Sequence, residues 1–117
     1  MEKLIYHILS RSDWEAQESE LYYTSESLAR QGFIHCSTKD QVIGVVSRLF
    51  HGRTDLILLE INESTLTASI TYENLEGGET LFPHIYGKLN KSAILSVIAF
   101  PCLSDGNFKL PSAISNK

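Results

Sequence analysis

The chain has 117 residues, of which 43% are hydrophobic and 21% are charged, a balance typical of a folded globular protein and not of a disordered chain. Fourteen acidic and ten basic residues give a net charge of −4, without the basic patch through which proteins bind nucleic acids. The two cysteines, Cys36 and Cys102, are not spaced like metal ligands, so they predict neither a disulfide framework nor a zinc ribbon.

The length fits one domain. We expect residues 1–103 to form it and residues 104–117, which are polar and contain Pro111, to be a loosely ordered C-terminal tail. No stretch approaches the roughly 20 apolar residues of a membrane-spanning helix, and the N-terminus makes a poor signal peptide. The sequence therefore predicts a cytoplasmic protein that binds neither membranes nor nucleic acid, and it leaves the oligomeric state open.

The first part of the chain predicts two strands with a short helix between them. Residues 3–10 (KLIYHILS) are apolar on both faces, as in a central strand covered on two sides. Ser12 and Glu15 have the spacing of a capping box, which predicts a short helix near residues 12–17. Residues 33–37 (FIHCS) predict the second strand.

The main helix is predicted over about residues 39–51. Thr38 is its expected N-cap, and Gln41 completes a capping box. Apolar residues then recur along one helical face, at Val42, Val45, Val46, Leu49 and Phe50. We therefore expect Val46 and Leu49 to lie in the core, where Leu49→Ala would cost about 2–5 kcal/mol.

Three further strands are predicted at residues 55–61 (DLILLEI), 68–73 (ASITYE) and 92–100 (SAILSVIAF). Residues 74–82 form a loop that contains glycine, and Pro83 interrupts regular pairing after it. The whole pattern predicts an α+β domain with a mixed, mostly antiparallel twisted sheet of four to six strands, the main helix and the short helix.

His35 and Ser37, within GFIHCST at residues 32–38, are candidate ligand-binding residues. Side chains two positions apart on a strand project to the same face. Ser37 and Thr38 also lie where the strand gives way to a helix N-terminus, whose free N–H groups favour an anion. A helix needs only one cap, so we expect His35 and Ser37 to hold the sugar or phosphate of a ligand, with backbone N–H groups near Thr38.

His84 and Tyr86 repeat this arrangement in FPHIYG at residues 82–87, after the loop that contains Glu79. Polar residues on loops that a rigid scaffold holds are often functional. We therefore expect His35 and Ser37 to share one cleft with His84 and Tyr86.

His7 lies mid-strand among apolar residues, where a buried imidazole needs a hydrogen-bond partner from the protein or from a ligand. A zinc site formed by His7, His35 and His84, with Glu79 as a fourth group, is chemically allowed. Because each ligand would come from a different segment, the spacing does not favour this site. No metal ligand is therefore predicted.

Four segments together resemble a known family, namely GFIHCST, DLILLEI, the pair Tyr72–Glu73 and FPHIYGKL. From about Ile5 to Val97 the chain is similar to the small bacterial family catalogued as domain of unknown function 952. More distantly, LIYHILS followed by GFIHCST resembles the ADP-ribosyltransferase superfamily, in particular its RNA 2′-phosphotransferase pattern.

The distant resemblance implies roles for particular residues. Tyr6 and His7 match the first motif of the superfamily and His35 matches the second, positions that grip the nicotinamide-ribose part of NAD. Cleavage of the nicotinamide bond passes through an oxocarbenium-like state that a nearby carboxylate, Glu79 or Glu73, could stabilise. Glu79 and His84 are the candidate catalytic residues by this resemblance, and NAD would be a substrate and not a resident cofactor.

Three functions follow from the sequence. The leading one is an ADP-ribosyltransferase-like domain that binds NAD or another nucleotide-like small molecule, with ADP-ribosyl transfer or NAD cleavage as the reaction if the domain is an enzyme. The second is a non-catalytic module that binds a small molecule. The third is a metal-dependent hydrolase that uses His7, His35 and His84. The net negative charge argues against RNA as a second substrate.

Overall fold

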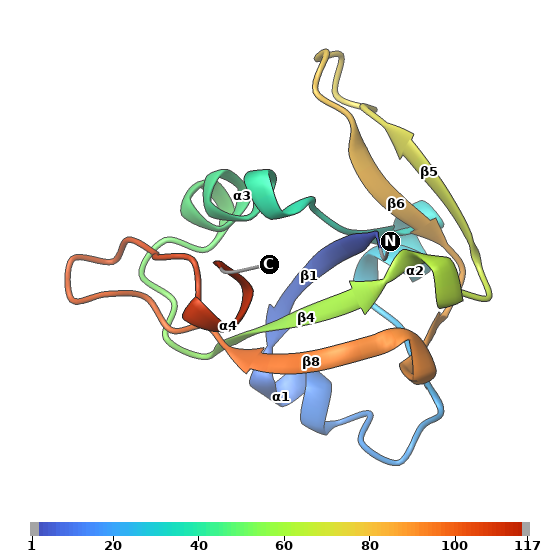
Figure 1. Cartoon of the computed structure of the whole chain (residues 1–117), viewed down its shortest axis with the longest axis horizontal. Helices are drawn as coiled ribbons and strands as arrows, with labels where there is room; N and C mark the ends of the chain where they lie inside the picture. Colours follow the sequence, from blue (N-terminus) through green and yellow to red (C-terminus); the bar gives the residue numbers. More distant parts are fainter. Residues whose placement is uncertain (1–2, 116–117) are drawn as a thin grey trace.

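The computed structural model describes residues 3–115 and confirms the predicted α+β class (Figure 1). The strands are β1 (Leu4–Ser10), β2 (Tyr22–Tyr23), β3 (Ile34–His35), β4 (Leu56–Asn62), β5 (Ser69–Glu73), β6 (Phe82–Tyr86), β7 (Leu89–Asn90) and β8 (Ile94–Ala99). The α-helices are α1 (Arg11–Glu15), α2 (Glu26–Gln31), α3 (Val42–Leu49) and α4 (Ser112–Ser115). Short 3-10 helices are η1 (Lys39–Gln41), η2 (Glu63–Thr65) and η3 (Lys91–Ala93). Within the described residues no helix is long and apolar enough to cross a membrane.

The strands form three small antiparallel sheets where the sequence predicted a single larger one. Their orders are β1-β4-β8, β2-β7 and β3-β6-β5. In Figure 1 the β5–β6 hairpin extends to the upper right, beyond the β1-β4-β8 sheet, and α3 lies at the upper left. The sequence patterns located the strands, but the way they group depends on contacts between distant segments.

The β1-β4-β8 sheet is covered on both faces. Its middle strand, β4, is buried along its whole length. The strand predicted to be central, β1, stands at the edge of the sheet. Ile5 and Leu9 of β1 face a core shared with the other two sheets. Tyr6, between them, faces a second core formed with α3 and the C-terminal segment. This alternation places His7 on the face toward the β3-β6-β5 sheet.

The main helix begins as predicted but presents a different stripe to the core. Gln41 Oε1 accepts a hydrogen bond of 2.9 Å from the backbone N–H of Thr38, in the predicted capping box. Val42 and Val46 are fully buried. Leu49, however, is 61% exposed, so our expectation that it lies in the core is wrong. Val42 and Val46 are four residues apart and define the buried stripe, and Leu49 falls at its margin, where it lines a cavity.

Two further findings concern the cap of α1 and the C-terminal segment. The short helix α1 is capped by Ser10, whose side chain accepts from the backbone N–H of Asp13 at 3.1 Å, and not by Ser12. The segment expected to be a loosely ordered tail contributes Phe108 and Ile114 to the second core. Residues 116 and 117 of that segment lie outside the described residues.

Candidate functional site

One face of the β3-β6-β5 sheet carries aromatic and ionisable side chains. Gly32 ends α2 with a φ of 88°, a conformation that favours glycine, and the chain then turns into β3. Phe33 and His35 are two residues apart and share a face, and His84 of β6 pairs directly with His35. The same face also carries Glu73, Phe82 and Tyr86. The opposite face, with Ile34, Cys36 and Ile85, belongs to the first core.

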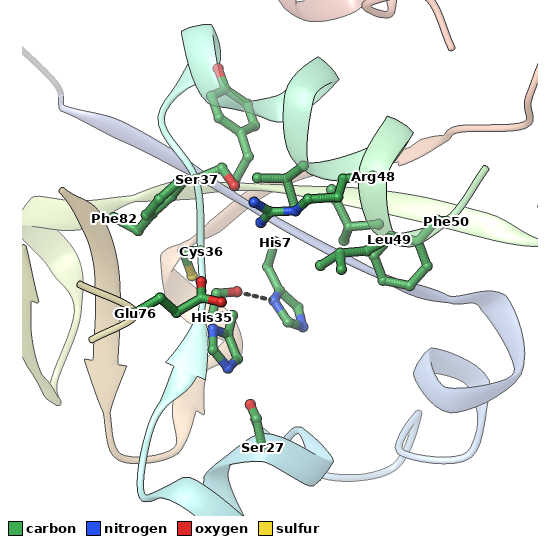
Figure 2. Close-up of a pocket in the computed structure, with 13 residues that line it drawn as sticks. His7, Ser27, His35, Cys36, Ser37, Arg48, Leu49, Phe50, Glu76 and Phe82 are labelled. Carbon is green, nitrogen blue, oxygen red and sulfur yellow. Dashed lines mark hydrogen bonds between the residues drawn. The ribbon is translucent and has the colours of Figure 1, made fainter. Parts of the chain in front are cut away.

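Two adjoining cavities lie between this face and the C-terminal end of α3. The first has a volume of about 230 Å³ and also reaches β1, and the second has a volume of about 480 Å³. Both are lined by His35, Arg48, Leu49, Glu76 and Phe82. In Figure 2 the side chains of Arg48 and Leu49 come from α3, and those of Glu76 and Phe82 lie on the opposite side. We call the two cavities together the histidine cleft.

His7 has both ring nitrogens engaged inside the protein. Nδ1 lies 2.6 Å from the backbone oxygen of His35, and Nε2 lies 2.9 Å from the hydroxyl of Tyr23. Because a carbonyl oxygen only accepts, Nδ1 carries the proton and Nε2 accepts from Tyr23. Burial lowers the pKa of His7 to about 4, so the ring is neutral at pH 7. His7 is therefore a core histidine that fixes the backbone of His35.

His35 is exposed and stands at the junction of the two cavities. Its Nε2 lies 2.8 Å from Oε1 of Gln31 on α2, so this nitrogen donates to the amide oxygen. Within residues 3–115 its Nδ1 has no hydrogen-bond partner. Partial burial, followed by the nearby His84, lowers the pKa of His35. The ring thus offers an unprotonated nitrogen near neutral pH.

His84 belongs to a cluster with Glu73 and Tyr86. Its Nδ1 lies 2.8 Å from Oε2 of Glu73, and the hydroxyl of Tyr86 donates to the same carboxylate oxygen. The bond from Tyr86, and then that from His84, holds the pKa of Glu73 below its usual range, while the carboxylate raises the pKa of Tyr86. His84 is buried, but its ring lines the second cavity. A carboxylate on one nitrogen orients this imidazole toward the cleft.

Aromatic contacts hold the two histidines in place. Phe33 stacks on His84 with ring centroids 4.1 Å apart and meets His35 edge-on at 4.8 Å. The rings of His35 and His84 are 5.3 Å apart and nearly perpendicular. Phe33 is itself buried, so it provides a fixed aromatic contact for both imidazole rings.

The structure brings most of the predicted site residues together. Tyr6, His7, His35 and Ser37 line the first cavity, and His35 and His84 line the second. Tyr86 lines neither cavity but reaches the cleft through Glu73, which lines the second. The hydroxyl of Tyr6 donates to Oε2 of the buried Glu60 at 3.1 Å.

Two predicted site residues lie outside the cleft, and the metal-site alternative lacks one of its ligands. Thr38 caps η1 and does not line the cleft. Glu79 lies exposed in the β5–β6 loop away from both cavities, and Glu73 and Glu76 are the carboxylates at the cleft. His7 has no nitrogen left to bind a metal. In the described part of the chain, no group of three or more His, Cys, Asp and Glu side chains could hold a metal ion.

Sequence reasoning missed several residues of the cleft. Arg48 was not singled out as a ligand-binding residue, because it lies on an exposed helical position far from either histidine segment. Gln31, at the end of α2, and Glu76, in the β5–β6 loop, were also missed, because neither belongs to a motif that the sequence singled out. The available signal for Glu73 was the Tyr72–Glu73 pair at the end of a predicted strand. That strand pairs with the strand of His84, but the sequence did not favour Glu73 over Glu79 as the carboxylate of the site.

Known proteins match the chain in both sequence and structure. Residues 8–97 match the model of the family described as "Protein of unknown function (DUF952)". The crystal structure of protein CC0527 from Caulobacter crescentus is 31% identical, with 92% of this chain and 94% of that chain covered and a TM-score of 0.81. The solution NMR structure of the same protein is 30% identical, with 97% and 98% covered and a TM-score of 0.82. No curated protein matches the chain.

Proposed function

We propose a ligand-binding function for this chain, which belongs to the family described as "Protein of unknown function (DUF952)". The ligand is a nucleotide-like small molecule, and it binds in the histidine cleft. The observation that carries this proposal is that His35, Arg48 and Phe82 line both adjoining cavities.

The cleft offers the three kinds of contact that a nucleotide needs. Phe82 supplies an aromatic wall in both cavities, with Phe50 in the first and Phe33 in the second, against which a base can stack. The planar guanidinium of Arg48 suits phosphate oxygens. The imidazole of His35 and the hydroxyl of Ser37 suit the sugar. Mostly apolar walls with a few converging polar groups are typical of small-molecule sites.

NAD and ADP-ribose are the first ligands to test, because the sequence resembles the ADP-ribosyltransferase superfamily at Tyr6, His7 and His35. ADP-ribosyl transfer or NAD cleavage is the corresponding reaction, and binding without turnover is the alternative. His7 contributes to either function indirectly, since its ring is bound to the backbone of His35.

A thermal-shift measurement tests the proposal. A ligand that binds only the folded state adds about 2.7 kcal/mol of stability at one hundred times its Kd. Saturating NAD, ADP-ribose or a mononucleotide should therefore raise the Tm of the wild type by several degrees, and His35→Ala should remove most of that rise. His51→Ala, which changes a histidine outside both cavities, is the matched control and should keep it. An unmoved wild-type melting curve with all three classes of ligand would refute the nucleotide proposal.

A further inference from the structure

His35 and His84 are arranged as a pair of proton-transfer groups. They occupy directly paired positions of β3 and β6, and both line the second cavity. Each ring is held through one nitrogen, His35 by Gln31 and His84 by Glu73, at 2.8 Å in both cases. In the described part of the chain the other nitrogen of each ring, Nδ1 of His35 and Nε2 of His84, has no hydrogen-bond partner. An oriented imidazole with one nitrogen left for the substrate is what general acid–base catalysis requires.

The two supporting groups differ, and the difference assigns the roles. Gln31 offers His35 a neutral amide oxygen, whereas Glu73 offers His84 a negatively charged carboxylate oxygen. His35 faces His84 on β6, Arg30 on α2 and Glu76 in the β5–β6 loop, and its pKa is lowered in this setting. His84 faces Glu73 on β5, Tyr86 on its own strand and His35. His35 is thus the proton acceptor and His84 the proton donor.

Arg48 indicates the chemical class of the substrate. It lines both cavities, and its guanidinium matches the oxygens of a phosphate. Hydrolysis of a phosphodiester needs a base for the attacking water, an acid for the leaving oxygen and a cation for the phosphate charge. His35, His84 and Arg48 supply these three groups on one cleft.

We propose that the histidine cleft hydrolyses a phosphodiester bond of a nucleotide, with His35 as general base and His84 as general acid. This inference rests on the nucleotide binding proposed above. Nδ1 of His35 takes a proton from water, and the water oxygen forms a bond to phosphorus. The bond from phosphorus to the leaving oxygen breaks, its electron pair stays on that oxygen, and Nε2 of His84 gives it a proton. A phosphomonoester and an alcohol result, and solvent returns the proton from His35 to His84.

Glu73 and Tyr86 are positioning residues in this scheme. The carboxylate of Glu73 holds Nδ1–H of His84, and Tyr86 donates to the same carboxylate oxygen. Glu73→Gln should lower kcat more than it raises KM and should alter the limb of the pH–rate profile that reports the acid. Glu73→Asp, which restores a carboxylate, should recover part of kcat. If Glu73 had only a structural role, Glu73→Gln would not alter the pH–rate profile and would not lower kcat more than it raises KM.

The test is incubation of the protein with 2′,3′-cyclic AMP, 3′,5′-cyclic AMP and the dinucleotide ApA, with the products followed by ³¹P NMR. We expect a phosphomonoester from at least one of them. His35→Ala and His84→Gln should each lower the rate by about 10²-fold or more. His51→Ala should cleave like the wild type. Because His84 is buried, unfolding curves must show that His84→Gln is folded; the exposed His35 provides the second variant.

The outcomes separate this inference from the proposed function. If nucleotides raise the Tm but none of the three phosphodiesters is cleaved, the catalytic inference is overturned and the binding function stands. Cleavage that persists in both His35→Ala and His84→Gln also overturns it, since the activity would then come from elsewhere. If no nucleotide binds, the proposed function fails and the catalytic inference fails with it.

Discussion

Tyr6 and Ser37 exchange two backbone hydrogen bonds of 2.8 Å, which join β1 to the segment that follows β3. This bridge covers the edge of the β1-β4-β8 sheet and ties it to the β3-β6-β5 sheet. It also fixes the point at which the chain leaves His35 and enters η1 and α3. The two sheets and the helix that form the histidine cleft are therefore held at one junction, and Tyr6 and Ser37 both line the first cavity.

The pairing of Tyr23 with His7 predicts a stability difference between two adjacent tyrosines. Tyr23 is 2% exposed and its hydroxyl lies 2.9 Å from Nε2 of His7, whereas Tyr22 is 44% exposed. Tyr23→Phe leaves a buried imidazole nitrogen unpaired, so it should lower the free energy of unfolding by about 1–3 kcal/mol. Tyr22→Phe is the matched control and should change it by about 0.5 kcal/mol or less. Equal effects in urea denaturation would mean that the Tyr23–His7 bond does not form.

The burial of His7 predicts acid sensitivity. Its pKa is about 4 in the folded protein and near 6.5 when exposed, so the unfolded chain binds more protons between these values. The free energy of unfolding is therefore unaffected by His7 above about pH 6.5. As the pH drops toward 4, protonation of His7 in the unfolded chain lowers it by about 3 kcal/mol. Urea denaturation between pH 7 and pH 4.5 measures the slope.

A variant isolates the contribution of His7 from other groups. The pKa of His35 is also lowered, and it adds to the slope in the same direction. His7→Asn keeps a donor near the carbonyl of His35 but does not titrate, so its stability should depend less on pH than that of the wild type. Parallel pH profiles for the two proteins would show that His7 is not buried as a neutral ring.

Truncation of two residues of α3 should lower stability by very different amounts. Val46 is fully buried, so Val46→Ala should lower the free energy of unfolding by about 2 kcal/mol. Leu49 is 61% exposed, so Leu49→Ala should cost about 0.5 kcal/mol or less. Chemical denaturation of both variants checks the phase of the helix. A larger loss for Leu49→Ala would restore the stripe that the sequence predicted.

The C-terminal segment should contribute to stability through one side chain. Ile114 is fully buried in the core that contains Phe100 and Phe108. Ile114→Ala should therefore lower the free energy of unfolding by about 2–5 kcal/mol. Lys109→Ala, at an exposed position of the same segment, is the control and should have little effect. If both substitutions are neutral, residues 104–115 form the loosely ordered tail expected from the sequence.

Local patterns predicted most of the elements and the central part of the site. Alternation along each strand gave the pairs His35–Ser37 and His84–Tyr86, because a period of two depends only on neighbouring residues. The pairing of His35 with His84 joins two strands that are distant in sequence, so alternation alone could not predict it. The division into three sheets could not be predicted, since it depends on which distant strands pair. Ile114 was missed because the few apolar residues of the C-terminal segment show no regular period.

The predicted site was incomplete because it also depends on contacts between distant segments. The partners of the histidines come from α2, β2 and β5, and no short motif connects Gln31, Tyr23 or Glu73 with the rings that they hold. Glu79 has the residue type expected of a catalytic group, but the β5–β6 loop carries it away from the cleft. Sequence order places Glu79 closer to His84, while strand pairing places Glu73 beside it.

The location of a bound nucleotide tests the central claim most directly. Crystals of the wild type soaked in ADP-ribose, or in NAD, should show ligand density in the histidine cleft, with the ligand in contact with His35, Arg48 and Phe82. Crystals of His35→Ala treated in the same way should show weaker density or none. Ligand density at another surface of the wild-type protein, or an empty cleft at saturating concentration, would contradict the account.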